Sequence, residues 1–198
     1  VQYGDLRLIT QVLTDEETVN ELHIKADMLC NNILARRQPF AIDLRQVLGA
    51  IHTINDLERI GDEAKKIALK ARDMEASAQR LGLPVDVIRK IGEDVRAMLD
   101  KALDAFVRHD SVAAAKIMEI DRDIDAQRAD LLKQLMAWIG GDGDRPRSSQ
   151  AVSAGMDLIF VVQSIERVGD HAKNVAGYVV RVVDGKDLRH DGKFEAIS

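Results

Sequence analysis

The sequence contains few of the residues that stabilise disulfide-linked or β-rich folds. Its 198 residues include one cysteine, three prolines and only 4% aromatic residues. Cys30 has no second cysteine with which to form an internal disulfide bond, and aromatic residues are the ones that strands prefer. Since 46% of the residues are hydrophobic and 31% are charged, the composition predicts an all-α fold.

Long apolar runs and blocks of charge of one sign are also missing. The longest apolar run, at 156–162, is interrupted by Asp157 and is far shorter than the roughly 20 residues that cross a bilayer. The 28 basic and 33 acidic residues are interleaved, with a net charge of −5, so the basic surface expected of a nucleic-acid-binding protein is not indicated. Because no charged-then-apolar leader begins the sequence, we predict a cytoplasmic chain that neither inserts into a membrane nor binds nucleic acid.

Glycine and proline divide the sequence into helical segments. The strong breaks lie at Pro39, at 82–84 and at 140–146. Between them, apolar residues recur at spacings of three and four, which is typical of amphipathic helices. This pattern predicts helices over 6–37, 40–74, 85–109, 111–139 and 148–182. We expect Ser111 to cap the fourth helix, and the fifth to begin near 148–149.

One octapeptide pattern occurs twice. Glu-Arg-Ile-Gly-Asp-Glu-Ala-Lys at 58–65 matches Glu-Arg-Val-Gly-Asp-His-Ala-Lys at 166–173, 108 residues later. The second copy ends a unit of three predicted helices, whereas the first ends a unit of two. We therefore predict two tandem pseudo-symmetric three-helix bundles, 1–82 and 83–198, the first without its opening helix.

A unit of two helices would expose an apolar groove where a third helix should pack. We expect this groove to be covered either by the other repeat or by a second chain. A homodimer is the form of the second alternative that we predict.

Each copy of the pattern places two carboxylates four residues apart, on one face of a helix. The pairs are Glu58 with Asp62 and Glu166 with Asp170. Like charges at this spacing repel by about 0.2–0.5 kcal/mol. A bound metal ion would offset the repulsion, because hard cations take several oxygen ligands from neighbouring carboxylates.

The preceding helix of each unit supplies further oxygen ligands. Asp121 and Asp125 form another pair four residues apart in the second unit, and Glu16 and Asn20 occupy the matching positions in the first. If the helices pack antiparallel, each unit assembles a patch of four oxygen-bearing side chains. The first patch is weaker because Asn20 replaces an acid.

Ordinary ion pairs on a solvated face are the alternative for these acids. Candidate pairs join Asp62 to Lys66, and the second motif to Lys173 and Arg167. The duplication favours a shared role beyond such pairs.

The remaining singled-out residues have structural interpretations. Gly61 and Gly169 are expected to allow close approach of helices. His171 is expected to face solvent or form an ion pair, Cys30 to be a small buried side chain, and Trp138 to lie in the core or an interface. The sequence contains no Glu-x-x-His spacing of di-iron enzymes, phosphate-binding glycine loop, nucleophile elbow or catalytic triad, so no catalytic residues are predicted.

The doubled motif, together with Ala-Arg-Arg-Gln-Pro-Phe-Ala-Ile-Asp-Leu-Arg at 35–45 and Val-x-x-Gly-x-Asp-x-Arg-His at 182–190, closely resembles the PhoU family of bacterial phosphate-signalling regulators. The resemblance implies two tandem three-helix bundles that bind metal ions on their surface, iron or zinc, with magnesium or manganese as alternatives. Carried over residue by residue, it implies ligands at Glu58, Asp62, Glu166 and Asp170, helped by Asp121, Asp125, Glu16 and Asn20.

The resemblance also implies a function without catalysis. The family acts as a negative regulator of the phosphate-starvation response, and links the ATPase of a phosphate ABC transporter to a sensor histidine kinase at the cytoplasmic side of the inner membrane. Two alternatives are kept open. One is a helical metalloprotein whose carboxylate clusters buffer metal or carry out chemistry, and the other is a helical bundle that binds no metal.

Overall fold

The fold is a set of long antiparallel helices. A computed structural model describes residues 6–73, 83–141 and 148–185, and in these ranges it contains five α-helices and no strand. They are α1 (Leu6–Arg37), α2 (Ala41–Asp73), α4 (Val85–Arg108), α5 (Ser111–Gly140) and α6 (Ser149–Asp184). The all-α prediction is confirmed, and the helices lie where the sequence places them. No helix in the described ranges has both the length and the apolar character of a membrane span.

The ends of the helices show which residues act as caps. The Asp110 side chain caps α5 by accepting a hydrogen bond of 2.9 Å from the Ala113 N–H. The prediction of Ser111 was wrong, because Ser111 is already the first helical residue and the acid before it reaches the free N–H. At the start of α6, the Ser148 hydroxyl accepts from the Ala151 N–H at 3.2 Å.

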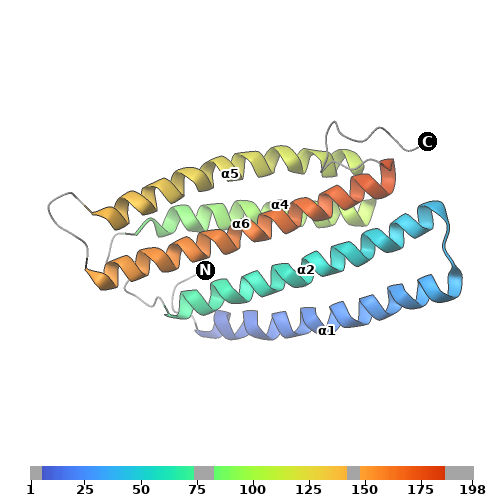
Figure 1. Cartoon of the computed structure of the whole chain (residues 1–198), viewed down its shortest axis with the longest axis horizontal. Coiled ribbons are helices and arrows are strands. Elements are labelled where there is room, and N and C mark those ends of the chain that lie inside the picture. Colours follow the sequence, from blue (N-terminus) through green and yellow to red (C-terminus); the bar gives the residue numbers. More distant parts are fainter. Residues whose placement is uncertain (1–5, 74–82, 142–147, 186–198) are drawn as a thin grey trace.

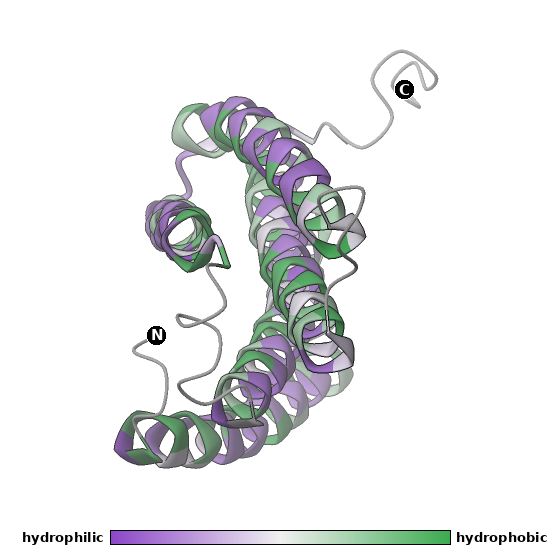
Figure 2. Ribbon diagram, turned by 90° about the vertical axis from the view of Figure 1, so that its left-hand side faces the viewer, coloured by the Kyte–Doolittle hydropathy of each residue, from purple (hydrophilic) through white to green (hydrophobic). Residues whose placement is uncertain are grey.

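Four of the helices form a curved row, and α4 packs against one face of that row. Figure 1 shows α5, α6, α2 and α1 side by side, with neighbours antiparallel. In the end-on view of Figure 2 this row is curved, and α4 lies against its upper half, where α4 packs on both α5 and α6. The first half of the chain consists of α1 and α2, and the second half consists of α4, α5 and α6. The two halves meet where α2 packs against α6, and we call this contact the α2–α6 seam.

The apolar core lies almost entirely in the second half. Its largest fully buried side chains include Met98, Ile117, Leu135 and Leu158, contributed by α4, α5 and α6. Trp138 packs against this core, as predicted. The second half is therefore held together by conventional hydrophobic packing.

The first half buries far less apolar surface. Its buried hydrophobic residues in the described ranges are Ile9, Cys30, Ala68 and Ala71, so the prediction for Cys30 is confirmed. On α1, large apolar side chains such as Leu22, Met28 and Leu29 are 57–61% exposed. This agrees with the expected open face beside α1 and α2, while its covering by a second chain stays a prediction.

A strained turn connects α1 to α2. Gln38 and Ala41 both have positive φ angles, 46° and 47°, in the left-handed region that costs a residue other than glycine about 1–3 kcal/mol. Between them, the Phe40 carbonyl accepts a hydrogen bond of 3.1 Å from the Asp43 N–H, which starts α2. The Phe40 side chain is 86% exposed.

The glycines at which two helices approach closely are not the motif glycines. A Cβ atom at Gly49 would lie 2.7 Å from Val182, and one at Gly155 would lie 2.7 Å from Ile139. At Gly61 and Gly169 a Cβ atom would make an ordinary contact of 3.5 Å. The close-approach role predicted for the motif glycines therefore belongs to Gly49 and Gly155.

This difference gives a paired test. We expect Gly155→Ala to lower the free energy of unfolding by about 1–3 kcal/mol, because the methyl group collides with a well-packed side chain. Gly61→Ala should instead raise it by about 0.5–1 kcal/mol, because alanine favours the helix and has room. Urea unfolding followed by circular dichroism measures both. A destabilising Gly61→Ala together with a neutral Gly155→Ala would contradict the assignment.

Candidate functional site

The predicted acids of the second unit gather around two basic side chains. Lys173 Nζ lies 2.9 Å from Asp121 Oδ2 and 3.0 Å from Asp170 Oδ1. Arg128 Nη2 lies 2.9 Å from Glu166 Oε1, and its Nε lies 3.6 Å from Asp125 Oδ1. The four acids thus lie in two pairs across α5 and α6, Asp121 with Asp170 around Lys173 and Asp125 with Glu166 around Arg128, and a shared metal site for them stays a prediction.

The first unit is only partly organised in the same way. Lys65 Nζ lies 2.9 Å from Glu16 Oε2, and the Asn20 amide donates to Glu16 Oε1 at 2.7 Å. Within the described ranges, Glu58 and Asp62 form neither a hydrogen bond nor an ion pair, and Asn20 Oδ1 is buried without a partner. Of the four predicted residues, Glu16 and Asn20 are therefore hydrogen-bonded to each other, whereas Glu58 and Asp62 are not part of this contact.

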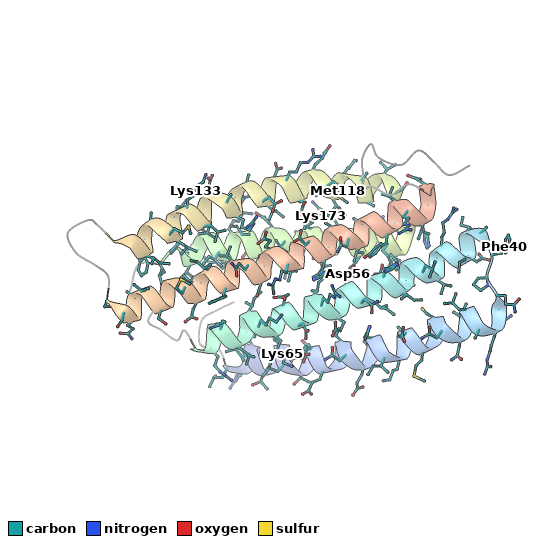
Figure 3. All side chains as sticks on the ribbon, viewed as in Figure 1. Phe40, Asp56, Lys65, Met118, Lys133 and Lys173 are labelled. Carbon is teal, nitrogen blue, oxygen red and sulfur yellow. The ribbon has the colours of Figure 1, made fainter. Side chains whose placement is uncertain are left out.

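A lysine–acid pair between neighbouring helices is common to both units. Lys65 and Lys173 are equivalent in the repeat, and Figure 3 shows them on α2 and α6, toward the partner helix of each unit. The hydrogen bond from Lys65 lowers the pKa of Glu16. Burial lowers the pKa of Lys173, but its hydrogen bonds with Asp121 and Asp170 outweigh burial, so its pKa is raised. The pair keeps both partners charged and fixes the register of each hairpin.

Further charged residues join the two units across the α2–α6 seam. The Glu63 side chain is 6% exposed and accepts hydrogen bonds from Lys66 at 2.8 Å and from Arg167 of α6 at 3.2 Å. Burial alone raises the pKa of Glu63, but hydrogen bonds from Lys66, Ser164 and Arg167 outweigh it, and the pKa is lowered. Glu63 is therefore a buried carboxylate held in its charged form by groups of both units.

A second polar contact crosses the same seam. His171 Nδ1 lies 2.6 Å from Asp56 Oδ1, and the Asn174 amide donates to the same oxygen at 3.5 Å. Asp56 and Ser164 are equivalent positions in the repeat, as are Glu63 and His171. The two contacts are therefore related by the pseudo-symmetry, and Figure 3 shows Asp56 between α2 and α6.

A hollow of about 380 Å³ opens at this seam. It receives one arginine and one aspartate from each copy of the motif. The lining residues are Arg59, Asp62, Glu63, Lys66, Arg167, Asp170 and His171. Asp62 and Asp170 thus face a shared seam, rather than two wholly separate sites.

Sequence reasoning missed three residues of this arrangement. Asp56 and Glu63 lie seven residues apart, which puts them on one face of α2, and this spacing was the available signal. Arg128 follows Asp125 by three residues, a spacing that places both on one face of α5. His171, expected to face solvent or to form an ion pair, contacts the Asp56 carboxylate, whereas Lys66 pairs with Glu63 instead of Asp62.

The two units differ in how well they suit a metal ion. In the described part of the chain, no group of three or more histidine, cysteine, aspartate or glutamate side chains is arranged to hold a metal. A metal in the second unit would have to displace Lys173 and Arg128 from their carboxylates. In the first unit, Glu58 and Asp62 form no ion pair in the described ranges, and Asn20 Oδ1 is buried without a partner, but a metal there would have to displace Lys65 from Glu16. One cation to displace instead of two makes the first unit the better fit to a hard cation.

Comparisons with known proteins give one family. The family profile described as PhoU domain matches residues 1–71 and 88–179. The chain is 38% identical over 189 residues to the phosphate-specific transport system accessory protein PhoU homolog of Pseudomonas aeruginosa, covering 96% of this chain and 75% of the relative. It is 35% identical to the phosphate-specific transport system accessory protein PhoU of Escherichia coli, over 95% of this chain and 75% of that protein.

Solved structures agree with the sequence comparisons. The crystal structure of PhoU from Pseudomonas aeruginosa superposes with a TM-score of 0.80 at 36% identity, covering 92% of this chain and 84% of the other. The regulatory protein PhoU from Streptococcus pneumoniae gives a TM-score of 0.79 at 23% identity, over 92% and 82% of the two chains, and supports the fold.

The lowered pKa of Glu63 predicts a pH-dependent contribution to stability. A carboxyl whose folded pKa lies below its ordinary value of 4.5 stabilises the fold above that pH, and this contribution is lost as the pH falls through the folded pKa. At about pH 7, we expect Glu63→Gln to lower the free energy of unfolding by about 1–3 kcal/mol. The loss should shrink steadily below about pH 4.

Glu58→Gln is the matched control on the same helix, and should change stability by less than about 0.5 kcal/mol. Urea unfolding of both variants in the presence of a chelator, at several pH values, makes the measurement. A deficit of Glu63→Gln that is the same at low and neutral pH would contradict the ion-pair explanation.

Proposed function

The chain belongs to the PhoU family, and from this premise we propose that it is a non-catalytic adaptor that represses the phosphate-starvation response. It couples a phosphate ABC transporter to a sensor histidine kinase, and favours the inactive or phosphatase state of the kinase when phosphate is plentiful. The adaptor works at the cytoplasmic face of the inner membrane, where it also modulates phosphate uptake. The observation that carries the proposal is the match to transport-system accessory proteins over nearly all of the chain.

The structure supports a role in presenting surfaces. The ionisable side chains around the seam bind one another, as in Lys66 and Arg167 on Glu63 and Lys173 on Asp170. Such pairs fix the relative positions of helices. A body built of five long helices offers extended faces on which a transporter subunit and a kinase domain can bind.

Tagged chain isolated from phosphate-replete cells tests the adaptor role. We expect the transporter ATPase and the sensor kinase of the same organism to co-purify with it, and to be depleted when phosphate is withdrawn, because the adaptor must hold both in the repressed state. Quantitative mass spectrometry of the two named proteins is the measurement. The tag alone is the control. Recovery of neither protein under either condition would end the proposal.

A metal-binding role is the second candidate, and the first unit favours it. Glu58, Asp62, Glu16 and Asn20 would hold an ion there, and Asp121, Asp125, Glu166 and Asp170 would form the second site. When bound, the metal would supply a positive charge that neutralises acids on one helix face. Oxygen ligands of this kind suit iron, magnesium and manganese, and zinc also accepts carboxylates. Metal buffering or metal chemistry is the corresponding alternative function.

The unequal pairing of the two units makes a specific prediction for metal binding. We expect Glu58→Gln with Asp62→Asn to remove the tighter metal equivalent, because one protein cation, Lys65, has to be displaced there, against two in the second unit. The equivalent double variant, Glu166→Gln with Asp170→Asn, should remove the weaker one. Elemental analysis after equilibration with iron, zinc, magnesium or manganese measures the loss, with circular dichroism confirming that both variants are helical. No metal on the unaltered chain, or equal losses, would contradict this order.

A further inference from the structure

The α1–α2 turn carries a large apolar side chain that the described part of the chain leaves uncovered. Phe40 is 86% exposed, the highest value among the large hydrophobic residues in the described ranges. Figure 3 shows it at the far end of the α1–α2 hairpin. Ile42 and Leu44 follow it on the surface, at 50% and 38% exposure. We refer to residues 36–44 as the Phe40 tip.

The backbone of the tip is held in a fixed and unfavourable shape. Gln38 and Ala41 have positive φ angles on either side of Phe40, and Pro39 restricts the chain between them. The two long helices that the turn joins determine this shape. Strain of this kind persists where structure overrides local preference, and it concentrates at sites that clamp ligands. Phe40 therefore projects from a short turn whose backbone shape is set by the helices on either side.

Basic residues lie close to Phe40 in the sequence. Arg36 and Arg37 are exposed in the last turn of α1, and neither forms an ion pair within the described ranges. Arg45 follows one turn into α2, with its guanidinium next to Gly185 at the end of α6. Asp43 is the one acid in the tip. The tip therefore carries a net positive charge, which complements carboxylates.

We propose that the Phe40 tip is a docking element, which inserts the Phe40 ring into an apolar pocket rimmed by carboxylates on a soluble protein domain of the transport and sensing complex. The inference rests on the proposed adaptor function and identifies the surface that contacts the partner. An exposed aromatic side chain with arginines nearby in the sequence has the composition of an interface hot spot. The arginines pair with the carboxylate rim and orient the ring.

A protein pocket explains the tip better than a lipid surface does. A fluid bilayer accepts an aromatic ring in any orientation, so it would not require the fixed turn. One ring and a few basic residues also give only weak and reversible attachment to a membrane, where firm binding takes larger apolar surface or several anchors. A protein pocket, in contrast, gains from a pre-organised partner because less flexibility is lost on binding.

Binding of the purified full chain to two defined probes tests the proposal. The probes are the purified ATPase subunit of the cognate phosphate transporter and the soluble domain of the cognate sensor kinase. We expect Phe40→Ala to weaken binding to at least one of them by about tenfold or more, as for a central anchor. Arg36→Gln with Arg37→Gln should weaken it too, and reduce its dependence on salt.

Met136→Ala is the matched control, since Met136 is a large apolar side chain of α5 that is 68% exposed. It should leave binding within about twofold of the parent, as expected outside a hot spot. Biolayer interferometry gives the dissociation constants, and circular dichroism confirms that each variant is folded. A tenfold loss confined to the tip variants supports the proposal.

The other outcomes are distinguishable. If the parent binds a probe and Phe40→Ala binds it equally well, the tip proposal is overturned while the adaptor function stands. If the parent binds neither probe, both fail. Sedimentation with phosphatidylglycerol vesicles and analytical ultracentrifugation complete the test. If Phe40→Ala abolishes vesicle binding or self-association but not probe binding, the occupant is a lipid surface or a second copy, and the proposal is wrong.

Discussion

The buried carboxylate of Glu63 is the interaction on which the arrangement of the two halves depends. It receives hydrogen bonds from Lys66 of its own helix and from Arg167 of the other unit. The first half buries few apolar side chains of its own, so hydrophobic packing alone gives it little to fix its position. Buried charged contacts are directional, and this seam therefore sets how α2 lies on α6 rather than only that the two helices associate.

The two copies of the motif are built on the same plan but are no longer chemically equivalent. Arg128 neutralises Glu166 in the second unit, and the matching position in the first is His23, whose ring contacts Asn55 at 2.8 Å. Glu58 therefore lacks the guanidinium partner of its counterpart. The acids of the second unit pair with Lys173 and Arg128, whereas in the first unit Lys65 pairs with Glu16, and Glu58 and Asp62 form no ion pair in the described ranges.

The course of the helices could be predicted from the sequence, whereas much of the pairing in the site could not. Pro39 and the glycine-rich breaks mark the helix ends because they act locally, and the apolar spacing fixes the helices between them. Arg167 and Glu63 are 104 residues apart in sequence. Their pairing depends on the direction and register of the two helices that carry them. No local pattern contains that information. The same reason explains why Gly49 and Gly155 were overlooked. Lys66 could pair locally with either Asp62 or Glu63, and spacing alone does not choose between them.

Only three residues, 38–40, connect α1 to α2, so a tilt of α2 at the α2–α6 seam would also move this end of the hairpin. Helix α2 runs without interruption from Ala41 to Asp73, and at about 1.5 Å per residue the stretch from Glu63 to Phe40 spans about 35 Å. A tilt of about 5° at the seam would swing the far end by about 3 Å over that length. A small change in the tilt of α2 on α6 would thus appear as a much larger displacement at the Phe40 end of the hairpin.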